Sequence, residues 1–298
     1  MNTAAKLGAY VLGLAVVFGG ALGVGTAVGT TGPAPAPAKQ SHVAQPAAAA
    51  KSDTPGGLQV SENGYTLNPI TTAIKPGEPT DFQFSVTGPD GKPVTDYQVQ
   101  HDKKLHFIVV SRDLTGFQHL HPQEGADGVW SVKLTLPEAG AYRAYADFAP
   151  TGGTGLTLGA DLLVAGEHAP KALPEASRTA TVDGYTVTLD GDLTPGKASK
   201  LTLKVSKDGK PVTDLQPYLG AYGHLVALRA GDLAYLHVHP EESATAGPEI
   251  VFFAEVPSRG DFRLFLDFQH AGTVRTADFT AHAEGTASSA PPAEHSGH

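Results

Sequence analysis

Hydrophobic and polar residues alternate with a period of two in several short stretches of this chain. In residues 82–86, 130–134 and 201–205, every second residue is a large apolar one. This period is typical of half-buried antiparallel strands. Turn-forming pairs at Asp90-Gly91 and Asp208-Gly209 are typical of hairpins between such strands. Beyond the N-terminus we find no long stretch with the period of an amphipathic helix, so the pattern predicts an all-β chain.

The chain also contains an internal duplication. The segment DGKPVTD occurs at Asp90–Asp96 and again at Asp208–Asp214. A period of roughly 118–120 residues is that of a whole domain rather than of a small solenoid unit. About seven short strands in each copy, with frequent turns, fit an immunoglobulin-like β-sandwich. A cupredoxin-like Greek-key barrel is the alternative.

The pattern at the N-terminus is different. Residues 7–28 are mostly apolar or glycine and follow Lys6. A helix of about 20 such residues is long enough to cross a bilayer. We therefore predict a retained transmembrane anchor with the bulk of the chain outside the cytoplasmic membrane. A cleaved signal segment is the alternative, and the protein would then be secreted.

These patterns predict a complete domain organisation. We expect two tandem immunoglobulin-like β-sandwich domains after an N-terminal transmembrane or signal helix and a Pro/Ala-rich linker. The expected boundaries are 1–30 for the anchor or signal segment, 31–57 for the linker, 58–165 for the first sandwich, 166–178 for a second linker, 179–283 for the second sandwich and 284–298 for a disordered, His-containing tail.

The composition of the chain excludes several classes of binding site and of catalytic site. The net charge of −9 argues against nucleic-acid binding through phosphate contacts. The chain has no Cys, and its one Met is the initiator, so thiolate and thioether ligands are both missing. We find no signature of a catalytic triad or of a zinc hydrolase, and we expect no enzyme activity and no organic cofactor.

Histidines are the candidate functional residues. Both copies contain a His, then a second His thirteen residues later, then His-Pro two residues on. The two copies align at a constant offset of 118 residues without a gap. The candidate metal ligands are therefore His106, His119, His121, His224, His237 and His239.

The spacing suggests how these histidines could bind a metal. His119 and His121 would point to one face of a strand. If the preceding strand pairs with theirs, His106 reaches the same ion, and the same logic applies to the second copy. Three imidazoles suit Zn or Cu(II). The alternative is that His106 and His224, which lie in apolar runs, are core histidines bonded to backbone.

Four charged residues and one further histidine are also candidates for a role near these sites. Arg143 with Asp147, and Arg263 with Asp267, are expected to form surface or cross-strand ion pairs. The alternative is that one of these aspartates orients a ligating histidine. His270 has no counterpart in the first copy and is expected in a surface loop.

Both copies share a set of motifs: a His, then His-x-His-Pro, then Pro-x-x-Gly-x-(Tyr/Phe)-Arg, then Asp-Phe. This set resembles that of actinobacterial membrane-anchored proteins with two immunoglobulin-like, YtkA-like domains. The resemblance covers residues 58–282. It implies an extracytoplasmic β-sandwich and a heavy-metal-associated role.

We therefore expect a membrane-anchored, extracytoplasmic protein that buffers or delivers Cu(II) or Zn. The alternative is a structural or protein-interaction module of the cell envelope in which the histidines only pack. The expected partners are a metal ion and the membrane; no protein partner is indicated.

Overall fold

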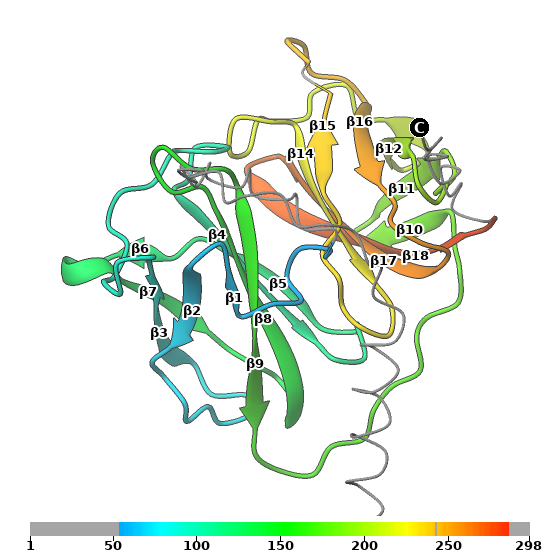
Figure 1. The fold of residues 1–298 in the computed structure, drawn as a ribbon. Coiled ribbons are helices and arrows are strands. Elements are labelled where there is room, and N and C mark those ends of the chain that lie inside the picture. The colour runs from blue at the N-terminus through cyan, green and yellow to red at the C-terminus, as the bar shows by residue number, and fades with distance from the viewer. Residues whose placement is uncertain (1–53, 242, 286–298) are drawn as a thin grey trace, which may run out of the picture. The chain divides into compact units, whose positions relative to one another are not determined.

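The computed structural model describes residues 54–241 and 243–285, and these residues form strands, turns and one short 3-10 helix (Figure 1). The expected membrane or signal segment, most of the Pro/Ala-rich linker and nearly all of the C-terminal tail lie outside the described residues. Within the described part, no helix is long and apolar enough to span a bilayer.

The first sandwich follows the immunoglobulin strand order. One sheet has the order β1-β2-β3-β7-β6, and the other has the order β5-β4-β8-β9. With β2 as strand A, these are the A-B-E-D and C′-C-F-G sheets. The elements are β1 (Ser61–Glu62), β2 (Tyr65–Pro69), β3 (Thr80–Thr87), β4 (Leu105–Ser111), β5 (Phe117–Leu120), β6 (Gln123–Glu124), η1 (Ala126–Gly128), β7 (Val129–Leu134), β8 (Gly140–Phe148) and β9 (Leu156–Val164).

The second sandwich repeats this order but differs in its edge strands: it adds β13 to one sheet and, among the described residues, has no counterpart of β5 in the other. Its sheets are β10-β11-β12-β16-β15, with β13 paired to β12, and β14-β17-β18. The elements are β10 (Thr179–Val182), β11 (Tyr185–Asp190), β12 (Ala198–Lys207), β13 (Lys210–Pro211), β14 (Gly223–Arg229), β15 (Val238–Pro240), β16 (Glu249–Glu255), β17 (Gly260–His270) and β18 (Thr273–Ala283).

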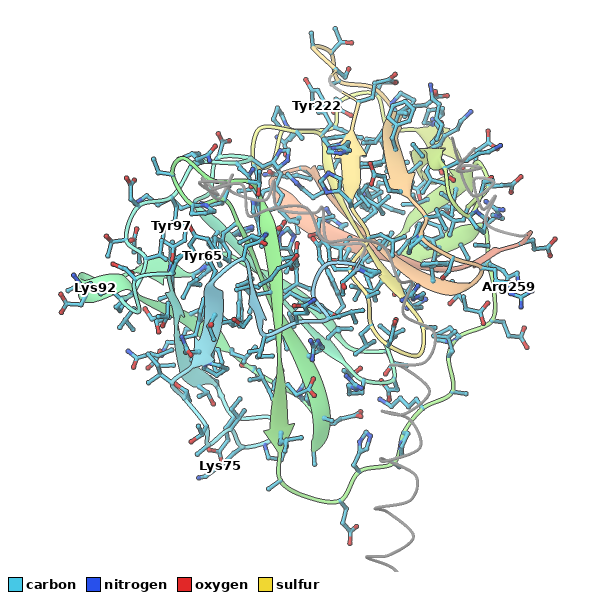
Figure 2. All side chains as sticks on the ribbon, viewed as in Figure 1. Tyr65, Lys75, Lys92, Tyr97, Tyr222 and Arg259 are labelled. Atoms are coloured by element: carbon cyan, nitrogen blue, oxygen red, sulfur yellow. The ribbon has the colours of Figure 1, made fainter. Side chains whose placement is uncertain are left out.

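The prediction of an all-β chain with two tandem immunoglobulin-like sandwiches is confirmed. The alternating residues of β3, β7 and β12 bury their apolar side chains, including Phe82, Phe84, Leu201 and Leu203. The hairpin expected at Asp208-Gly209 connects β12 to β13, where Lys207 pairs with Lys210. Charged side chains such as Lys75, Lys92 and Arg259 point away from the sheets (Figure 2).

The two sandwiches share a third apolar cluster. In β4, the odd-numbered residues Phe107 and Val109 lie in the first core, whereas Ile108 and Val110 lie in the shared cluster. In β14, β8 and β17, too, one face lies in its own domain's core and the other in the shared cluster. The rings of Phe117 and Phe265 stack across this interface at 4.0 Å. The sheet β5-β4-β8-β9 of the first sandwich and the sheet β14-β17-β18 of the second therefore bury their outer faces against each other.

Gly56 and Gly57 form a strap that contacts both sandwiches. The Tyr235 amide of the second sandwich donates to the Gly56 carbonyl at 2.9 Å. The Arg143 guanidinium of the first donates to the Gly57 carbonyl at 2.6 and 2.9 Å. The segment that leads in from the N-terminal linker is thus fixed at the junction between the sandwiches.

We expect Gly57→Ala to destabilise the fold by about 2 to 4 kcal/mol, from the left-handed backbone and from overpacking. Gly57 has a φ of +74°, and an added methyl group would lie 2.5 Å from ring carbons of Tyr145. Gly77→Ala is the matched control, because Gly77 has a φ of +73° but open space around it. Chemical denaturation would measure both, and equal losses would show that the strap is loosely packed.

Candidate metal centre

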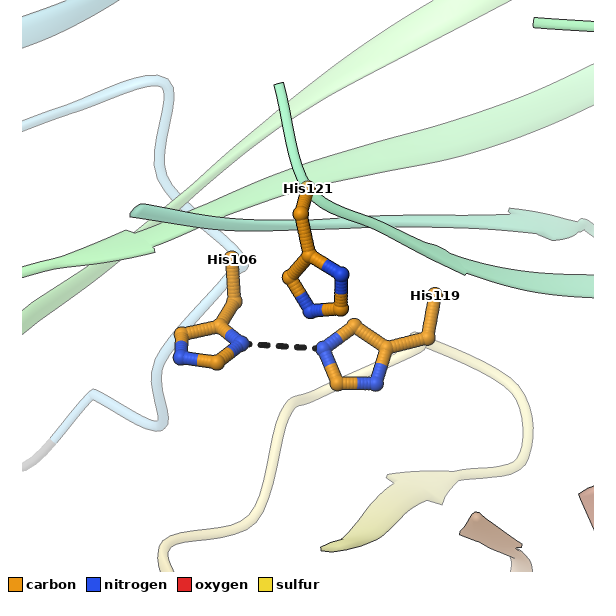
Figure 3. Close-up of side chains that lie close together, drawn as sticks. All are labelled: His106, His119 and His121. Atoms are coloured by element: carbon orange, nitrogen blue, oxygen red, sulfur yellow. Dashed lines mark hydrogen bonds between the residues drawn. The ribbon is translucent and has the colours of Figure 1, made fainter. Parts of the chain in front are cut away.

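Strands β4 and β5 bring the three histidines of the first copy together. The two strands pair antiparallel, with Ile108 opposite His119 and Phe107 opposite Leu120. This register places His106 beside the His119–His121 pair, as the spacing predicted. One nitrogen from each imidazole lies within 4.8 Å of the others. Figure 3 shows the three rings pointing toward one another.

Hydrogen bonds define which nitrogens face inward. The Nε2 of His106 lies 3.2 Å from the Gln100 carbonyl oxygen, so this nitrogen carries a hydrogen and donates. The Nδ1 of His119 lies 2.8 Å from a carboxylate oxygen of Asp267 and likewise donates. The remaining nitrogens, His106 Nδ1 and His119 Nε2, face each other at 3.0 Å.

Two lone pairs at that distance repel unless a cation lies between them. A proton on either nitrogen satisfies the pair by forming a hydrogen bond between the two rings. A metal ion satisfies it as well: two nitrogens about 2.0 Å from one tetrahedral ion lie about 3.3 Å apart. The donors are therefore arranged so that a metal ion can replace a proton.

His121 supplies the third nitrogen. Its Nε2 is buried and has no hydrogen-bond partner in the described part of the chain. Its Nδ1 lies 3.3 Å from the hydroxyl of Tyr218. A buried nitrogen without a partner is costly, and a metal ion would satisfy it. The donor set fits Zn or Cu(II).

Comparison with known proteins gives a family. Residues 59–164 and residues 180–285 each match the family described as a domain of unknown function, DUF8832. The chain belongs to this family. A search of curated proteins found none that matches this chain. The family that the sequence matches is DUF8832, and the resemblance to YtkA-like, heavy-metal-associated proteins stays a prediction.

Solved structures with related folds include bacterial surface proteins. The Escherichia coli adhesin FdeC is 15% identical over 76% of this chain and 65% of its own, with a TM-score of 0.25. The bacterial integrin-binding protein invasin is 13% identical over 74% of this chain and 39% of its own, with a TM-score of 0.22. A Corynebacterium diphtheriae protein described as membrane anchored is 10% identical over 78% of this chain and 61% of its own, with a TM-score of 0.23. The chain spans less than two thirds of each.

The second DUF8832 copy does not form the second three-histidine site that the repeat predicted. His237 and His239 are exposed, and their rings lie 3.9 Å apart. Residues Val238–Pro240 pair with β16 of the other sheet, whereas His119 lies on β5 beside β4. The His-x-His pair is therefore separated from His224, and the expectation of two equivalent sites is wrong.

His224 instead lies near the cluster of the first DUF8832 copy. Its ring centroid is 6.2 Å from that of His119 and 6.3 Å from that of His106. Its Nε2 lies 2.7 Å from the Tyr218 carbonyl oxygen, as His106 does to Gln100. The alternative of backbone-bonded histidines is thus correct for one nitrogen of each ring and leaves the other nitrogen available.

Burial keeps several of these imidazoles neutral. Desolvation, reinforced by the neighbouring His119, lowers the pKa of His106 to about 3. Desolvation likewise lowers the pKa of His121 and of His224 to about 4. A neutral imidazole is the form that binds a metal, so these residues are ready to act as ligands at neutral pH.

The expected arginine–aspartate pairs are not formed. Arg143 pairs with Asp161 on β9, and Arg263 pairs with Asp278 on β18. Residues two apart along a strand share a face, but the nearest carboxylates lie on the neighbouring strand. Asp267 contacts His119 instead, so it takes the alternative role of orienting a histidine, although His119 belongs to the other DUF8832 copy.

Two further histidines, His270 and His101, do not belong to the group formed by His106, His119 and His121. His270 lies 2.7 Å from the hydroxyl of Tyr185 and 3.1 Å from Asp214, so it does not serve the cluster. His101 was not singled out from the sequence, yet its ring lies 5.4 Å from that of His224. No local motif marks His101, because it belongs to the loop that precedes β4.

Proposed function

We propose that this DUF8832 tandem is a non-catalytic binding module that holds one transition-metal ion at His106, His119 and His121. One observation supports this most strongly: three imidazoles converge while hydrogen bonds direct lone pairs of two of them inward. Nitrogen donors without any Cys favour Cu(II) or Zn over Cu(I).

We place the module outside the cytoplasmic membrane, anchored by the N-terminal apolar segment or secreted if that segment is cleaved. The support is the apolar stretch at 7–28 followed by a Pro/Ala-rich spacer. In that setting a single buffered ion would serve metal storage or delivery.

A structural or protein-interaction role is the second candidate, and the fold itself favours it. Immunoglobulin-like sandwiches are common in cell-surface domains. The apolar interface holds the two copies together through Ile108, Val110, Val226 and Phe265 without help from an ion. In this role the cluster would hold a shared proton, and the histidines would only pack.

Calorimetric titration separates the two. For the metal-free full chain, titrated with Cu(II) and with Zn in separate runs, we expect tight binding of about one equivalent, because one three-histidine cluster converges among residues 54–241 and 243–285. Binding should also release a proton, detected as a heat that varies with the ionisation enthalpy of the buffer.

The control is a variant with the tail residues His295 and His298 replaced by alanine. The tight event should survive this change. Absence of saturable binding, or binding lost only with the tail histidines, would favour the structural role.

A further inference from the structure

Asp267 reaches the cluster from the second sandwich. One carboxylate oxygen lies 2.8 Å from His119 Nδ1, and the other accepts from the Thr276 hydroxyl at 2.5 Å. The side chains of His119 and Asp267 are only 5% and 6% exposed. Both oxygens are therefore engaged, and the carboxylate has one fixed orientation toward the imidazole.

The cavity at this position is lined by both domains. It measures about 80 Å³, and its walls include His106, His119 and Asp147 of the first sandwich and His224 and Tyr235 of the second. A site divided in this way is complete only while the two sandwiches are docked.

We propose that Asp267 is a positioning residue that holds His119 for the metal from across the domain boundary, so that ion binding and docking of the two sandwiches are coupled. The inference rests on the proposed metal function. It assigns the second DUF8832 copy a role: it supplies the support for a site whose three ligands all belong to the first copy.

The coupling has a physical cause. Hydrogen bonding of a ligating imidazole to a carboxylate fixes its tautomer and orientation and raises its basicity. Three neutral imidazoles do not offset the double charge of a buried ion, whereas the Asp267 carboxylate offsets part of it. By linkage, an ion that binds the docked form more tightly must also stabilise docking.

The repeat provides a matched control. Asp147 occupies the corresponding position on β8 and accepts from Thr157 at 2.9 Å, as Asp267 accepts from Thr276. Asp147 makes no hydrogen bond to a histidine among the described contacts. It shares the sheet position, the threonine partner and the charge, but not the contact to a ligand.

The experiment titrates the full chain with Cu(II) and with Zn, comparing wild type with D267N, T276V and D147N. We expect D267N to weaken binding 10- to 100-fold and T276V to weaken it less. D147N removes a carboxylate from the wall of the same cavity without breaking a hydrogen bond to a histidine, so it should weaken binding less than D267N does. The Cu(II) electron paramagnetic resonance spectrum should change in D267N, because the His119 ligand becomes a weaker donor.

Docking is measured separately by amide hydrogen exchange of β4 and β14. Added Zn should slow exchange in both strands of the wild type and have little effect on β14 of D267N. Unchanged affinity in D267N would overturn the inference and leave the proposed function intact. Equal weakening by D147N would replace positioning with a general charge effect, and absence of binding in the wild type would refute the metal function itself.

Discussion

His119→Ala is expected to weaken metal binding by at least about 100-fold. His119 lies between the two other parts of the site: its Nε2 is 3.0 Å from His106, and its Nδ1 is bonded to Asp267. Its loss removes one of the three proposed ligands, breaks the proposed His-x-His chelate and leaves the Asp267 carboxylate with Thr276 as its remaining hydrogen-bond donor. Competition with a chelator of known affinity measures the change.

His237→Ala is the control for this substitution. His237 occupies the position of His119 in the second copy, but it is exposed and lies away from the cluster. Its replacement should leave both affinity and stoichiometry unchanged. If the histidines only pack, His119→Ala would leave metal uptake unchanged and lower the melting temperature instead. If both variants lost binding equally, the second copy would form a site that this arrangement does not contain.

Much of the fold could be predicted from local patterns. Alternation at 82–86 and 201–205 predicted half-buried strands, and Asp208-Gly209 predicted a hairpin, because each depends only on residues adjacent in the chain. The cluster of His106 with His119 and His121 is also local. It needs only one antiparallel pairing, of β4 with β5, across a short turn.

Contacts between the domains could not be predicted in the same way. Asp267 lies 148 residues after His119, and no spacing rule links the two. One signal was present: residues 107–110 and 225–228 are continuous apolar runs, which indicate strands buried on both faces. Those runs indicate an interface but not which polar groups meet across it.

The two copies differ in structure at their His-x-His segments, although the sequence pattern there is the same. Corresponding sequences gave corresponding strands β4 and β14, but the segment after β14 pairs with β16 at Val238–Pro240. Two identical His patterns therefore have different surroundings. Strand pairing depends on the whole sheet, and the His spacing alone does not specify it.

The metal-free protein is expected to lose stability as the pH falls from about 6.5 to about 4. In this range the unfolded chain protonates His106, His121 and His224, whose ordinary pKa is 6.5. The folded protein keeps them neutral, because burial lowers their pKa to about 3, 4 and 4. The unfolded state then binds more protons, so stability rises with pH across this range.

Asp147 opposes part of this trend. Burial raises its pKa from 3.8 to about 6, so between these values the folded state binds the extra proton and gains stability as the pH falls. One aspartate offsets one histidine, which leaves a net difference of about two protons. These four groups together contribute at most about 2.7 kcal/mol per pH unit to the slope, and less because partly exposed groups are screened.

Urea denaturation at a series of pH values measures this slope directly. His224→Gln should reduce the slope by the equivalent of about one proton, since the variant removes one of the imidazoles whose pKa is lowered in the folded state. His237→Gln provides the exposed control, although burial also lowers the pKa of His237, so its effect should be smaller than that of His224→Gln. A stability independent of pH between 6.5 and 4 would mean that the interface histidines accept protons as readily as free ones. The cluster would then be open to water, and neither a buried ion nor a shared proton could account for its geometry.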